Sequence, residues 1–478
     1  MKQAKISYIL FMIVSLLGQI QEGHAQSSLL LYQLNEGPGV NPAILPTPEK
    51  YSFSIFPLAG TSVSYNSHDE VRNAFDIGTS NPSEEEITDI FKGFIHQKLV
   101  YQQADITWLS LGLRTKAGNF SMQVSEHAYG TVRLRGNLLD FFVEESETMF
   151  QLGNEQNFPG EGIHFRKYSL GYAKEMLHRK LEVGFRANLY FGKSFLSSDF
   201  SGSITEENER FYVRSSGQLN FSAPVTIIES PDGSKDLAAS ENSNALDYLT
   251  NTKNVGTGID LGLKYTVSPY LHVTASAMNL GTINFKNNLQ TLDFNGQSEL
   301  TSDKVSRQVL EDGTVVLVKN VDEISLSETF ENLYEVAGDQ PSSFNTTLPA
   351  IFIAGANYQV GTNLSVGLTD RLVKHNKLNY NSLLLSATTQ ITRHLHISLG
   401  YAAIAGSYAN IPFGLQYKWP GGSAYLITDN VLPVLDDSLS DIRGLSFGAS
   451  FYPFRPKTKY QEVPYLPFFR LKKQRRNR

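Results

Sequence analysis

The sequence predicts an all-β fold, a transmembrane antiparallel up-and-down β-barrel of about 14 strands with short helical inserts. Three observations predict it. Apolar and polar residues alternate with period two in many segments, as in 181–191, where the apolar side chains share one face. Such runs extend for about ten residues, the length of a tilted membrane strand. Aromatic residues, among them Tyr190, Phe191, Tyr417 and Trp419, stand near the ends of runs, as in the interfacial girdles of membrane barrels.

The composition narrows the class of protein. The 478 residues include 41 basic and 47 acidic side chains, 41% hydrophobic residues and no cysteine. This hydrophobic content excludes a disordered chain. The absence of cysteine excludes disulfide frameworks, thiolate zinc sites, iron–sulfur clusters and cysteine nucleophiles. We expect no cofactor and no nucleic-acid partner.

The N-terminus resembles a secretory signal. Lys2 and Lys5 precede an apolar stretch at 6–17, and small residues at 23–25 offer a cleavage site before Gln26. The apolar stretch is shorter than the roughly twenty residues that a membrane anchor needs. We therefore expect residues 1–25 to be a signal peptide and the mature protein to enter the outer membrane of a Gram-negative bacterium.

The predicted barrel spans residues 50–454. Alternating runs recur at 109–114, 120–125, 259–267, 271–277, 364–369, 395–401, 413–419 and 445–451. Short turns at 116–119, 268–269 and 420–422 join neighbouring runs, and such short connections make the strands antiparallel. Alternation alone does not separate a membrane barrel from a soluble sandwich. The lengths of the runs and the girdle residues favour the barrel.

Several segments interrupt the strand pattern. A capping box at Ser83–Glu86 opens a predicted helix to about residue 97, and residues 138–150 and 327–336 are also predicted helices. The insert 286–348 is polar and poorly patterned, and we interpret it as long loops or lumen inserts. The last strand is predicted to end at Phe454. A tail at 455–478 then carries nine basic residues and one acid, which either docks an acidic partner or anionic lipid, or is simply solvated.

A search for catalytic and metal motifs yields no enzyme. Residues 444–448 match the G-x-S-x-G pattern, but they lie inside an alternating strand and no helix follows. His394 and His396 share a strand face without a third ligand nearby, so no metal site is expected. His127, His164 and His272 are interpreted as structural. A lipid-modifying barrel whose serine and histidine come from separate strands stays open.

Two segments resemble known barrels. Asn41-Pro42-Ala43, ahead of the predicted first strand at 51–58, resembles the start of FadL-type outer-membrane barrels. In the hydrophobic-substrate transporters of that superfamily, and in the related type IX secretion accessory barrels, such a segment begins or lines a luminal hatch. Residues 414–419 and 424–430 resemble uncharacterised outer-membrane barrel proteins of Bacteroidota. The resemblance implies that residues 26–49 are an N-terminal luminal hatch or plug and that no cofactor is bound, and it transfers no ligand residue.

The polar faces of the strands supply candidates for the lumen: Arg114, Arg186, Asp260, Lys264 and His272. The favoured hypothesis is a FadL-like channel for hydrophobic or amphipathic solutes, embedded in outer-membrane lipid. One alternative is a non-enzymatic accessory or scaffold barrel that binds secretion-system or surface-assembly proteins. A second alternative is a secreted soluble β-sandwich binding protein, in which the apolar faces would form a buried core.

Overall fold

The computed structural model describes residues 30, 40–44, 51–66, 99–133, 138–143, 149–223, 225–229, 235–239, 245–301, 303–320, 329, 332–338, 340–376, 378–404, 407–435 and 442–453. The predicted signal peptide, the predicted helix at 83–97, Phe454 and the basic tail lie outside these residues, as does most of the predicted hatch. In the described part of the chain, no helix is long and apolar enough to cross a membrane.

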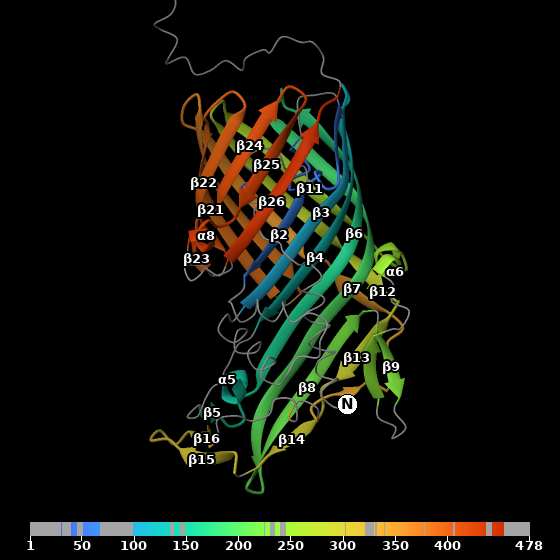
Figure 1. Ribbon diagram of the computed structural model, residues 1–478, viewed down its shortest axis with the longest axis vertical. Helices are drawn as coiled ribbons and strands as arrows, with labels where there is room; N and C mark the ends of the chain where they lie inside the picture. The colour runs from blue at the N-terminus through green and yellow to red at the C-terminus, as the bar shows by residue number, and fades with distance from the viewer. Residues whose placement is uncertain are drawn as a thin grey trace, which may run out of the picture.

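The barrel wall is built from long antiparallel strands (Figure 1). In chain order they are β1 (Tyr51–Ile55), β2 (Thr61–Asn66), β3 (Leu99–Arg114), β4 (Asn119–Arg133), β6 (Gln156–Met176), β7 (Leu181–Glu207), β11 (Asn254–Ser268), β12 (Leu271–Phe285), β18 (Phe344–Thr347), β19 (Ala350–Gln359), β20 (Leu364–His375), β21 (Leu378–Gln390), β22 (Leu395–Ile404), β23 (Ser407–Asn410), β24 (Phe413–Trp419), β25 (Gly422–Thr428) and β26 (Ile442–Phe451).

The wall closes on itself. The pairs β1 and β2, β18 and β19, and β23 and β24 each form one interrupted position, so that fourteen strand positions complete the ring in the described part of the chain. β26 pairs with β2 from Thr61↔Phe447 to Asn66↔Ile442, and β2 pairs in turn with β3. Closure leaves each of the fourteen strand positions with a neighbour on both sides, which is what a strand needs to cross a bilayer. The predicted fold class is confirmed.

The two ends of the barrel differ in their connections. Short turns at 115–118, 177–180, 269–270, 360–363, 391–394 and 420–421 all lie at one end, which we call the turn end. The predicted turns at 116–119, 268–269 and 420–422 are among them. Most connections at the other end, which we call the loop end, are long.

A second body projects from the loop end, at the bottom of Figure 1. β6 and β7 continue into it, since they are 21 and 27 residues long, and about ten residues suffice to span a bilayer. We call the body the extension. Its other elements are α5 (Leu138–Val143), β5 (Met149–Gln151), β8 (Arg210–Ser222), β13 (Leu289–Asp293), β14 (Gln297–Leu300), β15 (Val305–Val309), β16 (Val315–Lys319) and β17 (Glu335–Val336).

The extension has apolar cores of its own. β8 pairs with β7, β13 and β14, while β15, β16 and β5 form a separate three-stranded sheet. Phe141, Phe150 and Leu317 are fully buried between that sheet, α5 and the ends of β6 to β8. Burial of aromatic and aliphatic side chains on this scale stabilises the folded extension outside the barrel. The remaining elements are the hairpin of β9 (Val225–Glu229) and β10 (Lys235–Ala239), with α6 (Ala245–Thr250) and α8 (Leu432–Leu435).

The structure corrects four sequence predictions. The predicted helix at 138–150 ends at Val143, and Met149 and Phe150 belong to strand β5. Glu335 and Val336, predicted to be helical, form β17 because they pair with β13. The insert 286–348 contributes β13 to β17 to the extension as well as β18 to the wall, so it is neither loop nor lumen insert there. The last strand ends at Phe451.

Candidate functional site

The exterior of the barrel is apolar and its lumen is polar. Along β7, Val183, Phe185 and Leu189 are 40–48% exposed, whereas Arg186 and Asn188, which alternate with them, are about 4–5% exposed. β11, β20 and β21 repeat this pattern. Exposed aliphatic side chains around buried polar ones are the reverse of a soluble protein and are typical of a membrane barrel.

Aromatic side chains form a girdle near the turn end. Phe53 and Phe451 stack at 5.5 Å between ring centroids, and Trp419 packs against both Phe451 and Tyr417. Such rings sit at the headgroup level of a bilayer. Tyr190, which the sequence analysis assigned to a girdle, is instead fully buried in the lumen, because it lies on the same strand face as Arg186.

The structure places all five predicted lumen residues on inward-facing strand positions, but it brings only two of them together. Arg186 Nη1 lies 3.5 Å from Asp260 Oδ2, midway along the lumen. The other three lie near the turn end and pair separately: Arg114 with Glu175 (2.9 Å), Lys264 with Glu182 (2.9 Å) and His272 with Thr266 (3.1 Å). The five residues are therefore distributed along the lumen.

Asp260 is the centre of a buried ionic cluster. Its Oδ2 accepts a hydrogen bond from Lys167 Nζ at 2.8 Å, and its Oδ1 accepts from Asn188 Nδ2 and from the backbone N–H of Asn279, each at 2.8 Å. Lys167 also donates to Asn279 Oδ1 at 2.9 Å. The donors come from β6, β7 and β12, so the carboxylate joins three strands besides its own. Asp260 itself has no exposed surface.

The segment 40–44 lies inside the barrel against this side of the wall. Asn41 Nδ2 donates to the carbonyl oxygens of Leu263 on β11 and Ala275 on β12, at 3.3 and 3.2 Å. Asn41 Oδ1 accepts from the backbone N–H of Ala43 at 2.8 Å, which fixes a tight turn around Pro42. The amide side chain thus both shapes the segment and attaches it to the wall.

Two glycines make room for the segment. Gly184 on β7 and Gly262 on β11 are direct partners in the wall. A Cβ on Gly184 would lie 2.3 Å from the Pro42 carbonyl oxygen, and a Cβ on Gly262 would lie 2.0 Å from Asn41 Oδ1. Any side chain at either position would overlap the segment. The Asn-Pro-Ala motif and the two glycines are therefore sterically matched.

A cavity of about 130 Å³ lies beside the segment in the middle of the lumen. Its lining includes charged and polar groups, among them Asp105, His127, Lys167 and Arg371. Arg371 is 2% exposed and donates from Nη2 to Gln103 Oε1 at 2.6 Å. A space of this size with polar walls has room for a few water molecules or a small polar group.

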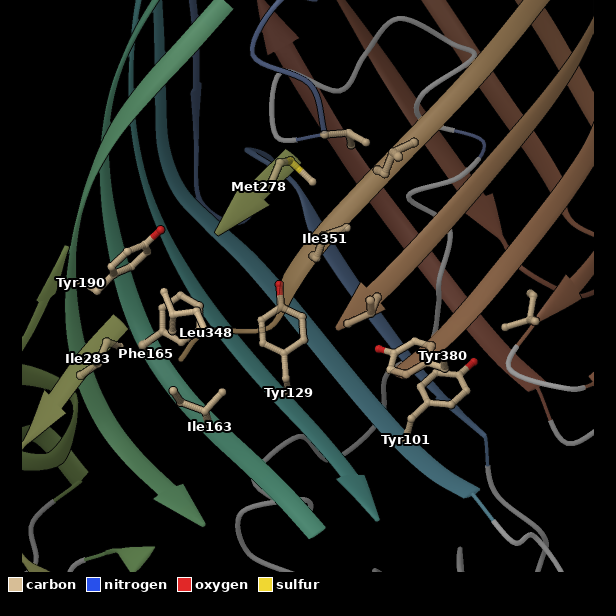
Figure 2. Packing of buried hydrophobic residues seen from close by; sticks show 14 of the residues in the cluster. Tyr101, Tyr129, Ile163, Phe165, Tyr190, Met278, Ile283, Leu348, Ile351 and Tyr380 are labelled. Carbon is tan, nitrogen blue, oxygen red and sulfur yellow. The ribbon is translucent and has the colours of Figure 1, made fainter. Parts of the chain in front are cut away.

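Toward the loop end, the lumen becomes apolar. Figure 2 shows aromatic and aliphatic side chains that converge from β3, β4, β6, β7, β12, β19 and β21. Tyr101 and Tyr380 stack at 5.2 Å, and Phe165 meets the edge of Tyr190 at 5.4 Å. The lumen thus has an apolar zone next to the extension, a polar zone around Asp260, and ion pairs at the turn end.

Sequence reasoning missed most members of the polar zone. Lys167, Asn188 and Asn279 surround Asp260, and Asp105 lines the neighbouring cavity together with Lys167. Asn188 occupies the same face of its strand as Arg186, so alternation could have identified it. Lys167 is separated from Asp260 by 93 positions, and only the order of strands around the barrel brings the two together. In the described ranges, no three His, Asp or Glu side chains are placed to hold a metal ion.

A family model described as a family of unknown function (DUF5723) matches residues 42–429. A search of curated proteins finds no match.

The chain is also similar to several solved structures. One is the Pseudomonas putida toluene transporter TodX, with 12% identity over 87% of this chain and 93% of that chain and a TM-score of 0.35. A Pseudomonas aeruginosa FadL homologue has 10% identity over 86% and 92% of the two chains, with a TM-score of 0.38. The Ralstonia pickettii toluene transporter TbuX has 12% identity over 86% and 90%, with a TM-score of 0.36.

Proposed function

The chain belongs to DUF5723, a family of unknown function, and we propose that it is a FadL-like outer-membrane channel for hydrophobic or amphipathic solutes. The observation that carries this proposal is the zoned lumen: an apolar zone at the loop end leads to a polar zone in which the segment 40–44 is seated. In outer-membrane barrels the short turns face the periplasm and the longer loops face outward. A solute from outside would then meet the apolar zone first.

The polar zone favours an amphipathic solute over a purely apolar one. An apolar molecule that passed Asp260 and Lys167 would gain no contacts in exchange for the water it displaces, whereas a polar group could hydrogen-bond there. In this mechanism the apolar part of the solute binds among rings such as Phe165 and Tyr190, while its polar part reaches the cavity. The segment 40–44 acts as the hatch, which must shift before the solute continues to the turn end.

The test is uptake of a hydrophobic dye by Gram-negative cells that express the chain. N-phenyl-1-naphthylamine suits it, because its fluorescence rises when it reaches apolar surroundings. Gly262→Leu should displace the segment, since even a Cβ there overlaps Asn41, and should raise uptake severalfold over wild type. Gly361→Leu is the matched control, because no atom lies within 4 Å of the Cβ position in that turn. Equal uptake in vector, wild-type and Gly262→Leu cells would refute the channel.

A scaffold role is the second candidate, and the extension is the observation that favours it. This body has its own apolar cores and is larger than closing the barrel requires. A photo-crosslinking residue at Val309, which is 58% exposed on β15, should form one defined adduct in the native envelope. The same residue at Leu177, 61% exposed in a turn at the opposite end, serves as control. No adduct specific to Val309 would count against a scaffold.

A further inference from the structure

The lumenal face of β3 and β4 carries a serine, a histidine and an aspartate in one hydrogen-bonded line. Ser125 Oγ lies 2.7 Å from His127 Nε2, and His127 Nδ1 lies 2.5 Å from Asp105 Oδ1. Ser125 and His127 are two residues apart on β4 and therefore share a face. Asp105 is the direct partner of His127 on β3. The hydroxyl meets one ring nitrogen and the carboxylate meets the other, which is the connectivity of a nucleophile, a general base and an orienting acid.

Further contacts hold the imidazole in one orientation. Asp105 also accepts hydrogen bonds from the Tyr129 hydroxyl at 3.1 Å and from Gln103 Nε2 at 2.5 Å. The ring stacks on Phe165, with 5.2 Å between centroids and 26° between planes. An aspartate at Nδ1 places the proton of the neutral ring on that nitrogen, so that Nε2 is left to accept the serine proton. The general base is thus oriented before any substrate binds.

Two of the three residues line the central cavity. Asp105 and His127 line it, as do Thr107, the partner of Ser125 across β3, and Gln123, the previous residue on the same face of β4. Ser125 lies between Gln123 and His127 on the same face of β4 and is only 2% exposed, so it does not face bulk water. The volume of about 130 Å³ limits a substrate to an acyl group of a few carbons there.

A cation lies next to the serine. Lys167 is the direct partner of Ser125 across β4 and β6, and it also lines the cavity. Its ammonium group is fixed by Asp260 and by Asn279. A fixed positive charge in the cavity lining stabilises the oxyanion that forms when a carbonyl is attacked there.

We propose that Ser125, His127 and Asp105 form a hydrolase site for esters with short acyl groups. Ser125 Oγ attacks the ester carbonyl carbon while His127 Nε2 takes the hydroxyl proton. The bond from the carbonyl carbon to the alkoxy oxygen then breaks, and the alcohol leaves with the proton from His127. Water attacks the acyl-serine, His127 takes the proton of the water and returns it to Ser125, and a carboxylic acid is released. The balance is ester plus water to acid plus alcohol.

The test uses the purified full-length chain, folded in lipid vesicles. It is offered 4-nitrophenyl acetate to measure turnover, and separately a small dialkyl fluorophosphate, followed by peptide mass spectrometry. We expect ester hydrolysis and a phosphoryl adduct on Ser125. Ser125→Ala should lose both, while Ser121→Ala, at a serine on the same face of β4 that is not part of the cavity lining, should keep both. Absence of an adduct on wild type, or equal hydrolysis by Ser125→Ala, would overturn the proposal.

Two further variants separate catalysis from simple packing. Asp105→Asn should lower kcat by about 10³- to 10⁴-fold and change the pH profile, because Asp105 is a positioning residue that sets the histidine tautomer. The chain has no cysteine, so Ser125→Cys introduces a unique thiol. That thiol should react with iodoacetamide at least tenfold faster than the thiol of Ser110→Cys, at a serine that lines the cavity, because His127 promotes its ionisation. Equal reaction rates would show that the histidine does not activate position 125.

Discussion

Replacing Asp260 with alanine should destabilise the barrel more than any other single substitution of a lumen acid. The carboxylate is fully buried and accepts three hydrogen bonds of 2.8 Å, from Lys167, Asn188 and Asn279, with Arg186 at 3.5 Å. Without it, two buried cations face each other unpaired. Breaking a buried pair in this way costs about 3–5 kcal/mol, and we expect a loss of that size in the free energy of unfolding.

The assay is urea unfolding of the protein in lipid vesicles, followed by tryptophan fluorescence. The only two tryptophans, Trp108 and Trp419, lie in or beside the barrel wall and report on its unfolding. Asp303→Ala is the control, since that acid is fully exposed in the extension, and it should change nothing measurable. A loss below about 1 kcal/mol for Asp260→Ala would refute the reasoning, because such a value is typical of an exposed ion pair.

A second variant tests the cause of the loss. Lys167→Met removes one of the cations that Asp260→Ala leaves unpaired. The double variant should therefore be less destabilised than the sum of the two single variants, by at least about 1 kcal/mol. Simple additivity would mean that the carboxylate stabilises the wall by some means other than its pairing with Lys167.

Three more predictions address other parts of the molecule. Asp370 is exposed among leucines on the outward face of β20, so Asp370→Leu should raise the free energy of unfolding in lipid by about 1–2 kcal/mol. A decrease in that free energy would indicate that this face of β20 lies in water. Leu317→Ala removes a fully buried side chain from the extension and should lower the free energy of unfolding of the extension by about 2–5 kcal/mol. Proteolysis should then cut the extension, while the folded barrel still migrates differently on a gel before and after heating. Loss of that difference in migration would show that the two bodies unfold together. Hydrogen bonds from Thr314 lower the pKa of Asp312 below its usual 3.8. The stabilisation by that carboxylate is present above its unfolded pKa and is lost as the pH falls through the lower folded value. Amide exchange in the β15–β16 hairpin, corrected for its intrinsic dependence on pH, should therefore accelerate in acid. A corrected exchange rate that does not change with pH would contradict the prediction.

The sequence was sufficient for the barrel because its signals are local. Alternation identifies the two faces of each strand, and turns such as 116–119 identify the neighbours. The five predicted lumen residues all lie on inward positions for that reason. Tyr190 could have been placed correctly by the same rule, since it occupies the face of Arg186; its aromatic side chain led instead to a girdle assignment.

The extension was not predictable by the same rule. Beyond Gly192, the burial of β7 no longer alternates, and Phe195 and Leu196 are both buried because the strand there is covered on both faces. The predicted helix at 327–336 is wrong at its end, because Glu335 and Val336 pair with the distant β13. Propensity does not report such pairing.

The contacts of the polar zone depend on closure of the barrel. Arg371 and Gln103 are 268 positions apart, and Asn41 reaches Ala275 across 234. No local pattern encodes such distances. The line of Ser125, His127 and Asp105 is partly local, since two of its members are alternate residues of one strand, but Asp105 joins them only through the register of β3 against β4.

Spin-label accessibility in lipid vesicles is a direct test of the claim that the barrel spans a membrane with its apolar face outward. Leu368, 49% exposed on β20, and Val309, 58% exposed on the extension, are each replaced by cysteine in the otherwise cysteine-free chain and labelled. The label at 368 should collide with dissolved oxygen and be shielded from a water-soluble nickel chelate, while the label at 309 should show the opposite. Free access of the chelate to position 368 would contradict the claim.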